Sequence, residues 1–360
     1  MLTAVVSDLH LGAISGADVA RDGPNRERLL EALSGADRVV LLGDLLELRE
    51  RPLAALLESV RPFFERLGEV VSGRRVVLMA GNHDHALAEP WLARLRIEGR
   101  ELGPENEWPV ELGDGVAGRI AAWMPNTEVT FAYPGMQLRG DLYATHGHYL
   151  DLHLTVPRLE SIAAGAMGRI TGRGKSCSSA ADYEVVVGPM YAFYAGLAQG
   201  ASPAALERGA RISRTVWRRV TGNGTVGRLL LGRVTIPGAV AALNRLGLGP
   251  FKPELTGAEL RRSGLLAMGR VAEVLAPGAE NVLFGHTHRP GPLESDDPAE
   301  WTTLSGTRLW NSGNWFHESA LMGAGGDRSP YRPGTVVFLE AEGPPRIENP
   351  LRYAAAAGSG

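Results

Sequence analysis

The sequence of 360 residues contains little cysteine and no long apolar run. Its single cysteine, Cys177, excludes an intramolecular disulfide and a zinc site built from several cysteines. No apolar stretch reaches the roughly 18 residues that a membrane span needs. The first apolar run, Leu2 to Val6, has no basic region before it, is too short for a secretory signal and is followed by Asp8. The sequence therefore predicts a cytoplasmic protein.

Acidic residues prevail over most of the chain, but its middle is basic. Residues 152–280 contain 16 Lys and Arg against 8 Asp and Glu, whereas the whole chain has a net charge of −3. A basic segment in an acidic chain suggests that this segment faces an anionic partner. The alternative is that arginine is simply plentiful in this chain, where only Lys175 and Lys252 are lysines.

Short apolar segments alternate with helical patterns, which is typical of β-α-β construction. Strands are expected at residues 2–6, 38–42, 75–79, 138–145, 281–284, 307–310 and 335–340, and helices at residues 25–33 and 52–67. Residues 152–277 show helical spacing, breaks at glycine and proline, and almost no strand pattern. We therefore expect a helical insertion, or cap, within the β-α body. The tail, residues 354–360, is low in complexity and is expected to be disordered.

Five short polar motifs fall where predicted strands end. They are Asp8-Leu9-His10, Gly43-Asp44, Gly81-Asn82-His83-Asp84, Thr145-His146-Gly147-His148 and Gly285-His286-Thr287-His288. In an open α/β sheet, ligands gather outside the carboxyl ends of the strands, so five strand ends can bring their side chains to one place. Aspartate, asparagine and histidine together suit two divalent ions of Mn, Fe or Zn, which one carboxylate can bridge. Each motif alone is weak, but together they have five of the nine histidines of the chain at the expected places, namely His10, His83, His146, His286 and His288.

This series of motifs resembles that of the calcineurin-like metallophosphoesterases. Their pattern D-x-H, G-D, G-N-H-[DE], G-H and G-H-x-H is matched in order over residues 1–150 and 280–340. The resemblance implies an α/β fold in which a β-sandwich is flanked by helices. The body would consist of residues 1–151 and 278–353, and the helical cap of residues 152–277.

The resemblance also implies a role for each residue of the motifs. Asp8, His10 and His288 would hold one metal ion, Asn82, His146 and His286 would hold another, and Asp44 would bridge the two. His83 would stabilise or protonate the leaving group, and Asp84 would orient His83 through a hydrogen bond. The expected reaction is hydrolysis of a phosphodiester, pyrophosphate or phosphomonoester by a hydroxide that the metal ions activate. Mn²⁺ is the expected ion, with Fe or Zn as alternatives.

The segment Gly43-Asp44-Leu45-Leu46-Glu47 is similar to the form found in UDP-2,3-diacylglucosamine hydrolases. Those enzymes also have a helical lid between the fourth and fifth motifs, where this chain has its insertion. Two positions depart from that group, which typically has Arg in place of His83 and Asp in place of His148. The insertion is also longer than their lid. These departures leave the substrate open.

The insertion contains a row of arginines and an aromatic patch. Arg211, Arg214 and Arg218 recur at helical spacing and would share one face, where each could bind phosphate through two parallel hydrogen bonds. The aromatic patch consists of Met190, Tyr191, Phe193 and Tyr194. An apolar, arginine-rich cap suits a phosphorylated small molecule, a lipid-linked or nucleotide-linked substrate, or peripheral contact with an anionic membrane. The alternative is that the apolar residues pack on one another and the arginines are solvated.

Other functions compete with this interpretation. A nuclease is an alternative because a basic cap could follow a nucleic acid backbone, although the aromatic residues are not interleaved with basic ones as in a stacking groove. A non-catalytic scaffold would be expected to have lost ligands, and the pattern here has lost none. His148, the last residue of the fourth motif, is expected to contact the substrate. Cys177 has no general base indicated nearby, so a nucleophilic role is not expected.

Overall fold

The computed structural model describes residues 1–174, 176–200, 236–253 and 256–352. The strands are β1 (Thr3–Val6), β2 (Arg38–Leu42), β3 (Arg75–Met79), β4 (Glu107–Pro109), β5 (Glu128–Ala132), β6 (Gly135–Arg139), β7 (Leu142–Thr145), β8 (Asn281–Phe284), β9 (Arg308–Asn311), β10 (Val336–Leu339) and β11 (Arg346–Glu348). The helices are α1 (Gly23–Leu33), α2 (Leu53–Val70), α3 (Glu89–Glu98), α4 (Gly115–Ala122), α5 (Leu159–Ile170), α6 (Ala180–Gly200), α9 (Ile236–Arg245), α10 (Gly257–Leu275) and α11 (Ser319–Met322), with the short helical segments η1 (His85–Leu87), η2 (His148–Leu152) and η4 (Gly323–Arg328). Of the helices described, none is both long enough and apolar enough to cross a membrane.

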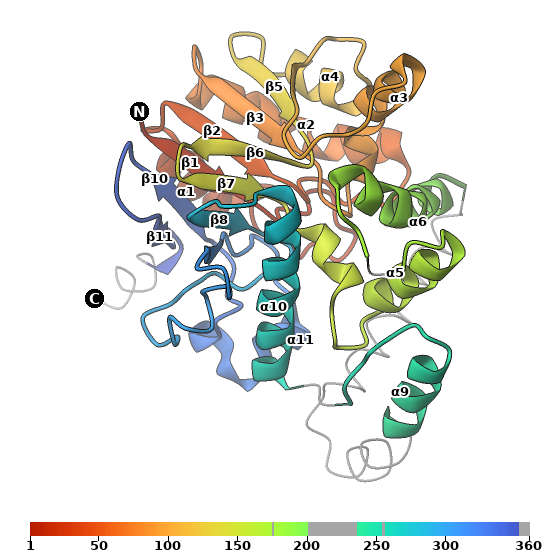
Figure 1. Ribbon diagram of the computed structural model, residues 1–360. Helices are drawn as coiled ribbons and strands as arrows, with labels where there is room; N and C mark the ends of the chain where they lie inside the picture. Colours follow the sequence, from red (N-terminus) through yellow and green to blue (C-terminus); the bar gives the residue numbers. More distant parts are fainter. Residues whose placement is uncertain (175, 201–235, 254–255, 353–360) are drawn as a thin grey trace.

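Two sheets form the body of the protein (Figure 1). One has the strand order β11-β10-β1-β2-β3-β5-β4, and the other has the order β6-β7-β8-β9. Strands β1, β2, β3 and β5 are parallel to one another, and so are β7, β8 and β9. Parallel strands end at the same edge of their sheet, as the five motifs require. The mixed α/β architecture with two sheets and flanking helices confirms the predicted fold class.

The side chains of each central strand divide between two apolar cores. Along β2, Val39 and Leu41 belong to the core that includes the helices, whereas Val40 and Leu42 belong to the core between the two sheets. Strands β1, β3, β7 and β8 divide their residues in the same way. Successive side chains of a strand point to opposite faces, so a strand buried on both faces forms a continuous apolar run. Such runs made β1, β2 and β3 predictable.

Residues 99–145 contain strands that the sequence pattern does not reveal. The prediction of one strand at residues 138–145 is wrong, because β6 and β7 pair antiparallel around a turn at Gly140 and Asp141. Strand β5 extends the large sheet beside β3, and β4 pairs with β5 at its edge. Strand β4 has only three residues and ends at Pro109, which leaves no alternating pattern to recognise.

The described residues of the insertion are largely helical and form α5, α6, α9 and α10. Figure 1 shows α5 and α6 next to each other at one side of the body and α10 in front of the smaller sheet. Tyr183 and Val187 of α6 belong to the same apolar core as the body, and so does Met268 of α10. Two helices of the insertion thus share the core of the body. The domain boundaries at residues 151–152 and 277–278 stay predictions.

An aromatic stack holds β5 to the neighbouring helix and gives a stability prediction. Phe131 of β5 is fully buried, and its ring centroid lies 4.1 Å from that of Trp91 in α3. Because its removal would leave a cavity, we expect Phe131→Ala to lower the free energy of unfolding by about 3–5 kcal/mol. Phe193→Ala is the control: Phe193 is 64 % exposed, so the expected change is less than about 0.5 kcal/mol. Urea denaturation measures both values, and equal values would contradict the packing described.

Candidate metal centre

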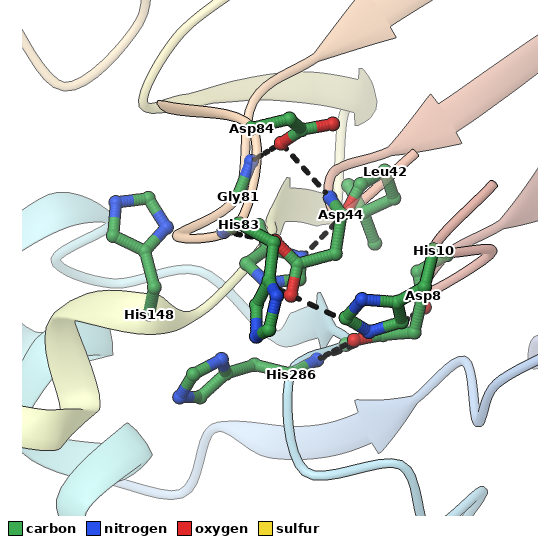
Figure 2. A network of polar contacts seen from close by, with 12 residues as sticks. Asp8, His10, Leu42, Asp44, Gly81, His83, Asp84, His148 and His286 are labelled. Carbon is green, nitrogen blue, oxygen red and sulfur yellow. Dashed lines mark hydrogen bonds and ion pairs between the residues drawn. The ribbon is translucent and has the colours of Figure 1, made fainter. Parts of the chain in front are cut away.

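The five predicted motifs follow the carboxyl ends of β1, β2, β3, β7 and β8. Figure 2 shows labelled side chains of these motifs around Asp44. Among the residues that the structure describes, three sets have possible ligand atoms within 4.8 Å of one another: Asp8, His10 and His288; His10, Asp44 and His83; and Asp44, His146 and His286. The structure therefore brings together residues that lie far apart in the sequence, and these sets of Asp and His could hold metal ions.

In the first set, three ligand atoms face one another. Nε2 of His288 lies 3.2 Å from Nε2 of His10 and 3.3 Å from Oδ1 of Asp8. Nε2 of His10 also lies 3.7 Å from Oδ2 of Asp44. Two imidazole nitrogens and two carboxylate oxygens at these separations can surround one small cation. This is the set predicted for one of the two ions.

The second predicted set shares Oδ2 of Asp44 with the first. Nε2 of His146 lies 3.4 Å from this oxygen. The side-chain amide of Asn82 places one terminal atom 3.2 Å from the same oxygen and 3.0 Å from Nδ1 of His286. Because Oδ2 of Asp44 is near ligand atoms of both sets, Asp44 occupies the position that a bridging ligand needs.

Each of the four predicted histidine ligands has an acceptor near its other ring nitrogen. Nδ1 of His10 lies 3.2 Å from Glu47, Nδ1 of His146 lies 2.9 Å from the carbonyl oxygen of Leu42, Nε2 of His286 lies 2.9 Å from Asp151, and Nδ1 of His288 lies 3.4 Å from Glu318. An acceptor keeps the proton on the nitrogen that it faces and leaves the lone pair of the other nitrogen for a metal. No motif in the sequence predicted a role for these acceptors.

Five of the predicted ligands have backbone conformations that residues other than glycine rarely adopt. The angle φ is 54° at Asp8, 46° at His10, 50° at Asp44, 65° at His286 and 60° at His288. Within the described parts of the chain, no other non-glycine residue has a positive φ. Strained backbone of this kind clusters at functional sites. Here it coincides with the residues that the motifs single out.

Two glycines allow the strand ends to approach each other closely. A Cβ atom added to Gly43 would lie 2.6 Å from Cγ of His146, and one added to Gly81 would lie 2.6 Å from Nε2 of the same ring. Any side chain at either position would displace His146. Steric crowding by His146 therefore explains why the second and third motifs each contain a glycine.

Two polar groups among the ligands predicted for the second ion lack partners that suit them, which tests the fit of a metal. Nε2 of His146 is buried and has no hydrogen-bond partner among the described residues. The amide oxygen of Asn82 faces only acceptors, and its nitrogen faces Arg49. Exchange of the oxygen and nitrogen of the Asn82 amide by rotation would give both atoms suitable partners. A cation bound jointly by Asn82, Asp44 and His286 would give the amide oxygen a suitable partner without rotation. Carboxylate and amide oxygens with imidazole nitrogens form a donor set that fits two ions of Mn, Fe or Zn.

His83 is the most exposed histidine of the centre, with 26 % of its side chain accessible. Its Nδ1 lies 2.6 Å from Glu47, which is therefore placed to orient the ring. This differs from the predicted role of Asp84. Asp84 instead accepts hydrogen bonds from backbone amides of both loops, those of Asp44, Leu45, Leu46 and Gly81. Asp84 thus joins the loops that follow β2 and β3, and burial together with the charge of Asp44 raises its pKa to about 7.

Arg49 contacts the centre, although no sequence motif includes it. Its guanidinium lies 3.2 Å from Nε2 of His83 and 3.8 Å from Glu160 of α5. It also lies 4.9 Å from the ring centroid of Tyr194 in α6. Arg49 therefore connects the centre to two helices of the insertion. The only signal in the sequence was its place in the loop that carries Asp44.

His148 is almost completely buried, with 1 % exposure. Its Nε2 lies 3.2 Å from the hydroxyl of Tyr133, and Figure 2 shows His148 apart from the cluster around Asp44. Its ring centroid lies 5.6 Å from that of His146. The predicted contact of His148 with the substrate stays a prediction, and its burial favours a supporting role beside His146.

The predicted features of the insertion fall into two classes. Arg211, Arg214 and Arg218 lie outside the described residues, so their role stays a prediction. The aromatic patch is divided: Met190 and Tyr191 are buried, Phe193 is exposed, and Tyr194 lies next to Arg49.

Elsewhere in the insertion, burial raises the pKa of Cys177 to about 11. A thiol with a raised pKa is unreactive, which agrees with the expectation that Cys177 is not a nucleophile.

Nearby carboxylates raise the pKa of two predicted ligands, which gives a prediction about pH. Burial lowers the pKa of His146, but Asp44 outweighs burial and raises it to about 9. For His288, Asp8 and Glu318 likewise outweigh burial and raise the pKa to about 10. Below these values a metal must displace protons, so we expect Mn²⁺ binding to release protons and to strengthen between about pH 6 and pH 9. Calorimetric titration in buffers of different ionisation enthalpy measures the release, and binding without it would contradict the prediction.

Comparison with known proteins relates the first part of the chain to one family. Residues 1–177 match the family of the calcineurin-like phosphoesterases. No curated protein matches the chain. The matched region contains the first four motifs and extends through α5, whereas the motif Gly285–His288 lies outside it. Residues 1–177 are therefore similar to the calcineurin-like phosphoesterases, and the architecture of two sheets with flanking helices is consistent with that fold.

Proposed function

We propose that the protein is a metal-dependent hydrolase that cleaves a phosphodiester, pyrophosphate or phosphomonoester bond with two divalent ions. The observation that carries this proposal is the position of Asp44, whose Oδ2 lies 3.7 Å from Nε2 of His10 and 3.4 Å from Nε2 of His146. The family match supports hydrolysis of phosphoesters. The ligands would be Asp8, His10, Asp44, Asn82, His146, His286 and His288, and Mn²⁺ is the ion we propose.

The chain would contribute orientation and charge to the reaction. When bound, two divalent ions would polarise the phosphoryl group and lower the pKa of a water molecule toward neutrality. Glu47 faces Nδ1 of His83 and leaves Nε2 as the nitrogen that can act on a leaving group. Arg49 lies beside that nitrogen and can donate hydrogen bonds to an anionic substrate.

We propose that the phosphate group of the substrate is linked to a lipid or a nucleotide. Helices α5 and α6 expose several large apolar side chains: Leu159 (66 %), Ile170 (76 %), Phe193 (64 %) and Leu197 (55 %). Together with the basic balance of the insertion, these residues support an amphiphilic phosphate and peripheral contact of a cytoplasmic protein with an anionic membrane. The narrower resemblance to UDP-2,3-diacylglucosamine hydrolases belongs to the same proposal. A panel of phosphodiesters, pyrophosphates, monoesters and single-stranded DNA, assayed with Mn²⁺, separates this proposal from a nuclease.

Removal of Asp44 tests the dinuclear arrangement. Asp44→Ala would take a donor from both ions, so we expect the rate of hydrolysis of a generic aryl phosphate ester to fall by more than about 100-fold. Chelation of the wild type should abolish the same activity. Asp141→Ala is the control, because Asp141 lies at the opposite end of β7 from the motifs. If Asp44→Ala kept two Mn²⁺ ions and its rate, the bridging role would be wrong.

The role of His83 can be separated from metal binding. His83→Ala should keep both ions, since His83 is outside the predicted ligand set. Loss of a general acid typically costs about 10²–10⁴-fold in rate. We expect a loss of this size with an alkyl leaving group and a smaller one with nitrophenol, which departs without protonation. Equal losses for the two leaving groups would argue for charge stabilisation and against an acid role.

A further inference from the structure

A buried carboxylate next to the centre, Asp151, was not predicted to take part in the site. It lies in η2, the short helical segment after the motif that contains His146, and its side chain is 1 % exposed. Its Oδ1 lies 2.9 Å from Nε2 of His286. Nδ1 of the same ring faces the amide of Asn82 at 3.0 Å. His286 is thus held between Asp151 at one nitrogen and the predicted metal position at the other.

This arrangement determines which nitrogen of His286 is free to bind. Coordination through Nδ1 requires the proton to be on Nε2. A carboxylate that accepts a hydrogen bond from Nε2 favours this tautomer, orients the ring and makes Nδ1 more basic. Glu47, in contrast, contacts both His10 and His83. Asp151 therefore acts on a single predicted ligand and, through it, on one of the two metal positions.

The other oxygen of Asp151 contacts the insertion. Its Oδ2 lies 3.5 Å from the hydroxyl of Tyr191, whose single proton is shared between this oxygen and the carbonyl oxygen of His148 at 3.3 Å. Tyr191 belongs to α6 and is 1 % exposed. A side chain of the insertion thus touches the residue that orients a predicted metal ligand.

Helix α6 is fixed in this position by a second buried contact. Glu184 lies seven residues before Tyr191, or about two helical turns along the same face. Its carboxylate accepts hydrogen bonds from Tyr133 at 2.7 Å and from Tyr149 at 3.0 Å, and it lies 2.8 Å from Nε2 of His85. These partners all belong to the body. A shift or rotation of α6 would break this network, so the position of Tyr191 is closely determined.

We propose that Asp151 is a positioning residue for His286, that Tyr191 keeps Asp151 in place, and that the insertion thereby sets the affinity of one metal position. This inference rests on the proposed function, because it requires His286 to bind a metal. It also goes further, since the insertion then acts on the metal centre as well as on the substrate. Helix α6 is consequently more than a cap that covers a preformed site.

Titration of the metal-free, full-length protein with Mn²⁺ tests this inference. The wild type should bind two ions, and Asp151→Asn should bind one of them about 10–100-fold more weakly while the other is unaffected. Tyr191→Phe removes only a hydroxyl and should weaken the same ion by a smaller factor. Tyr183→Phe is the matched control. Tyr183 is a buried residue of the same helix, and its hydroxyl lies 2.7 Å from Nε2 of His153 and not near a predicted ligand.

The visible absorption of the Co²⁺-loaded protein supplies a second readout. Asp151→Asn and Tyr191→Phe should change the Co²⁺ bands, and Tyr183→Phe should not. Wild-type affinities in both Asp151→Asn and Tyr191→Phe would overturn the inference and leave the proposed function intact. An equal loss in Tyr183→Phe would also overturn it, because it would indicate a general loosening of α6. If Asp151→Asn does not fold, the comparison of Tyr191→Phe with Tyr183→Phe decides, and a wild type that binds no Mn²⁺ refutes the proposed function itself.

Discussion

The centre depends on the buried carboxylate of Asp44. Burial raises its pKa, but His146, His83 and His10 outweigh burial and hold the pKa well below its ordinary value. A charge removed from water is costly unless positive or coordinating groups surround it. The surrounding strand ends must therefore bring their side chains very close to Asp44. The positive φ angles of the ligands and the missing side chain at Gly43 are consequences of this convergence.

The convergence in turn requires two sheets. Asp8, Asp44 and Asn82 follow strands of the large sheet, whereas His146 and His286 follow strands of the small one. The facing sides of the sheets share an apolar core, to which β2 contributes Val40 and Leu42 and β8 contributes Leu283. The two groups of ligands cannot separate unless this core opens. The geometry of the centre and the stability of the sandwich are therefore linked.

The sequence predicted the parts of the site that depend on local structure. A buried strand followed by glycine and a polar residue is visible in a single stretch of sequence, as at Gly43-Asp44, Gly81-Asn82 and Gly285-His286. This pattern was sufficient to place these residues at strand ends, whereas their roles as metal ligands stay predictions. The acceptors behind the histidines depend on packing between distant segments, and Asp151 and His286 are 135 residues apart. No spacing rule could connect them. The position of Arg49 between the centre and α6 also results from tertiary packing, as does the edge strand β4.

The place of the insertion in the chain explains why its helices contact the centre. Its predicted bounds, residues 152–277, place its start at the end of η2, which carries Asp151, and its end before β8, which leads to His286. Its last helix, α10, is tied to its beginning because Ser263 accepts a hydrogen bond from the backbone amide of Thr155 at 2.9 Å. Both predicted ends of the insertion thus join elements that carry predicted metal ligands, and α6 contacts Asp151 between them. If our proposal for Asp151 is correct, a substrate whose binding moves α6 changes the affinity of the centre for metal. Thermodynamic reciprocity then requires metal binding to change the affinity for that substrate by the same factor.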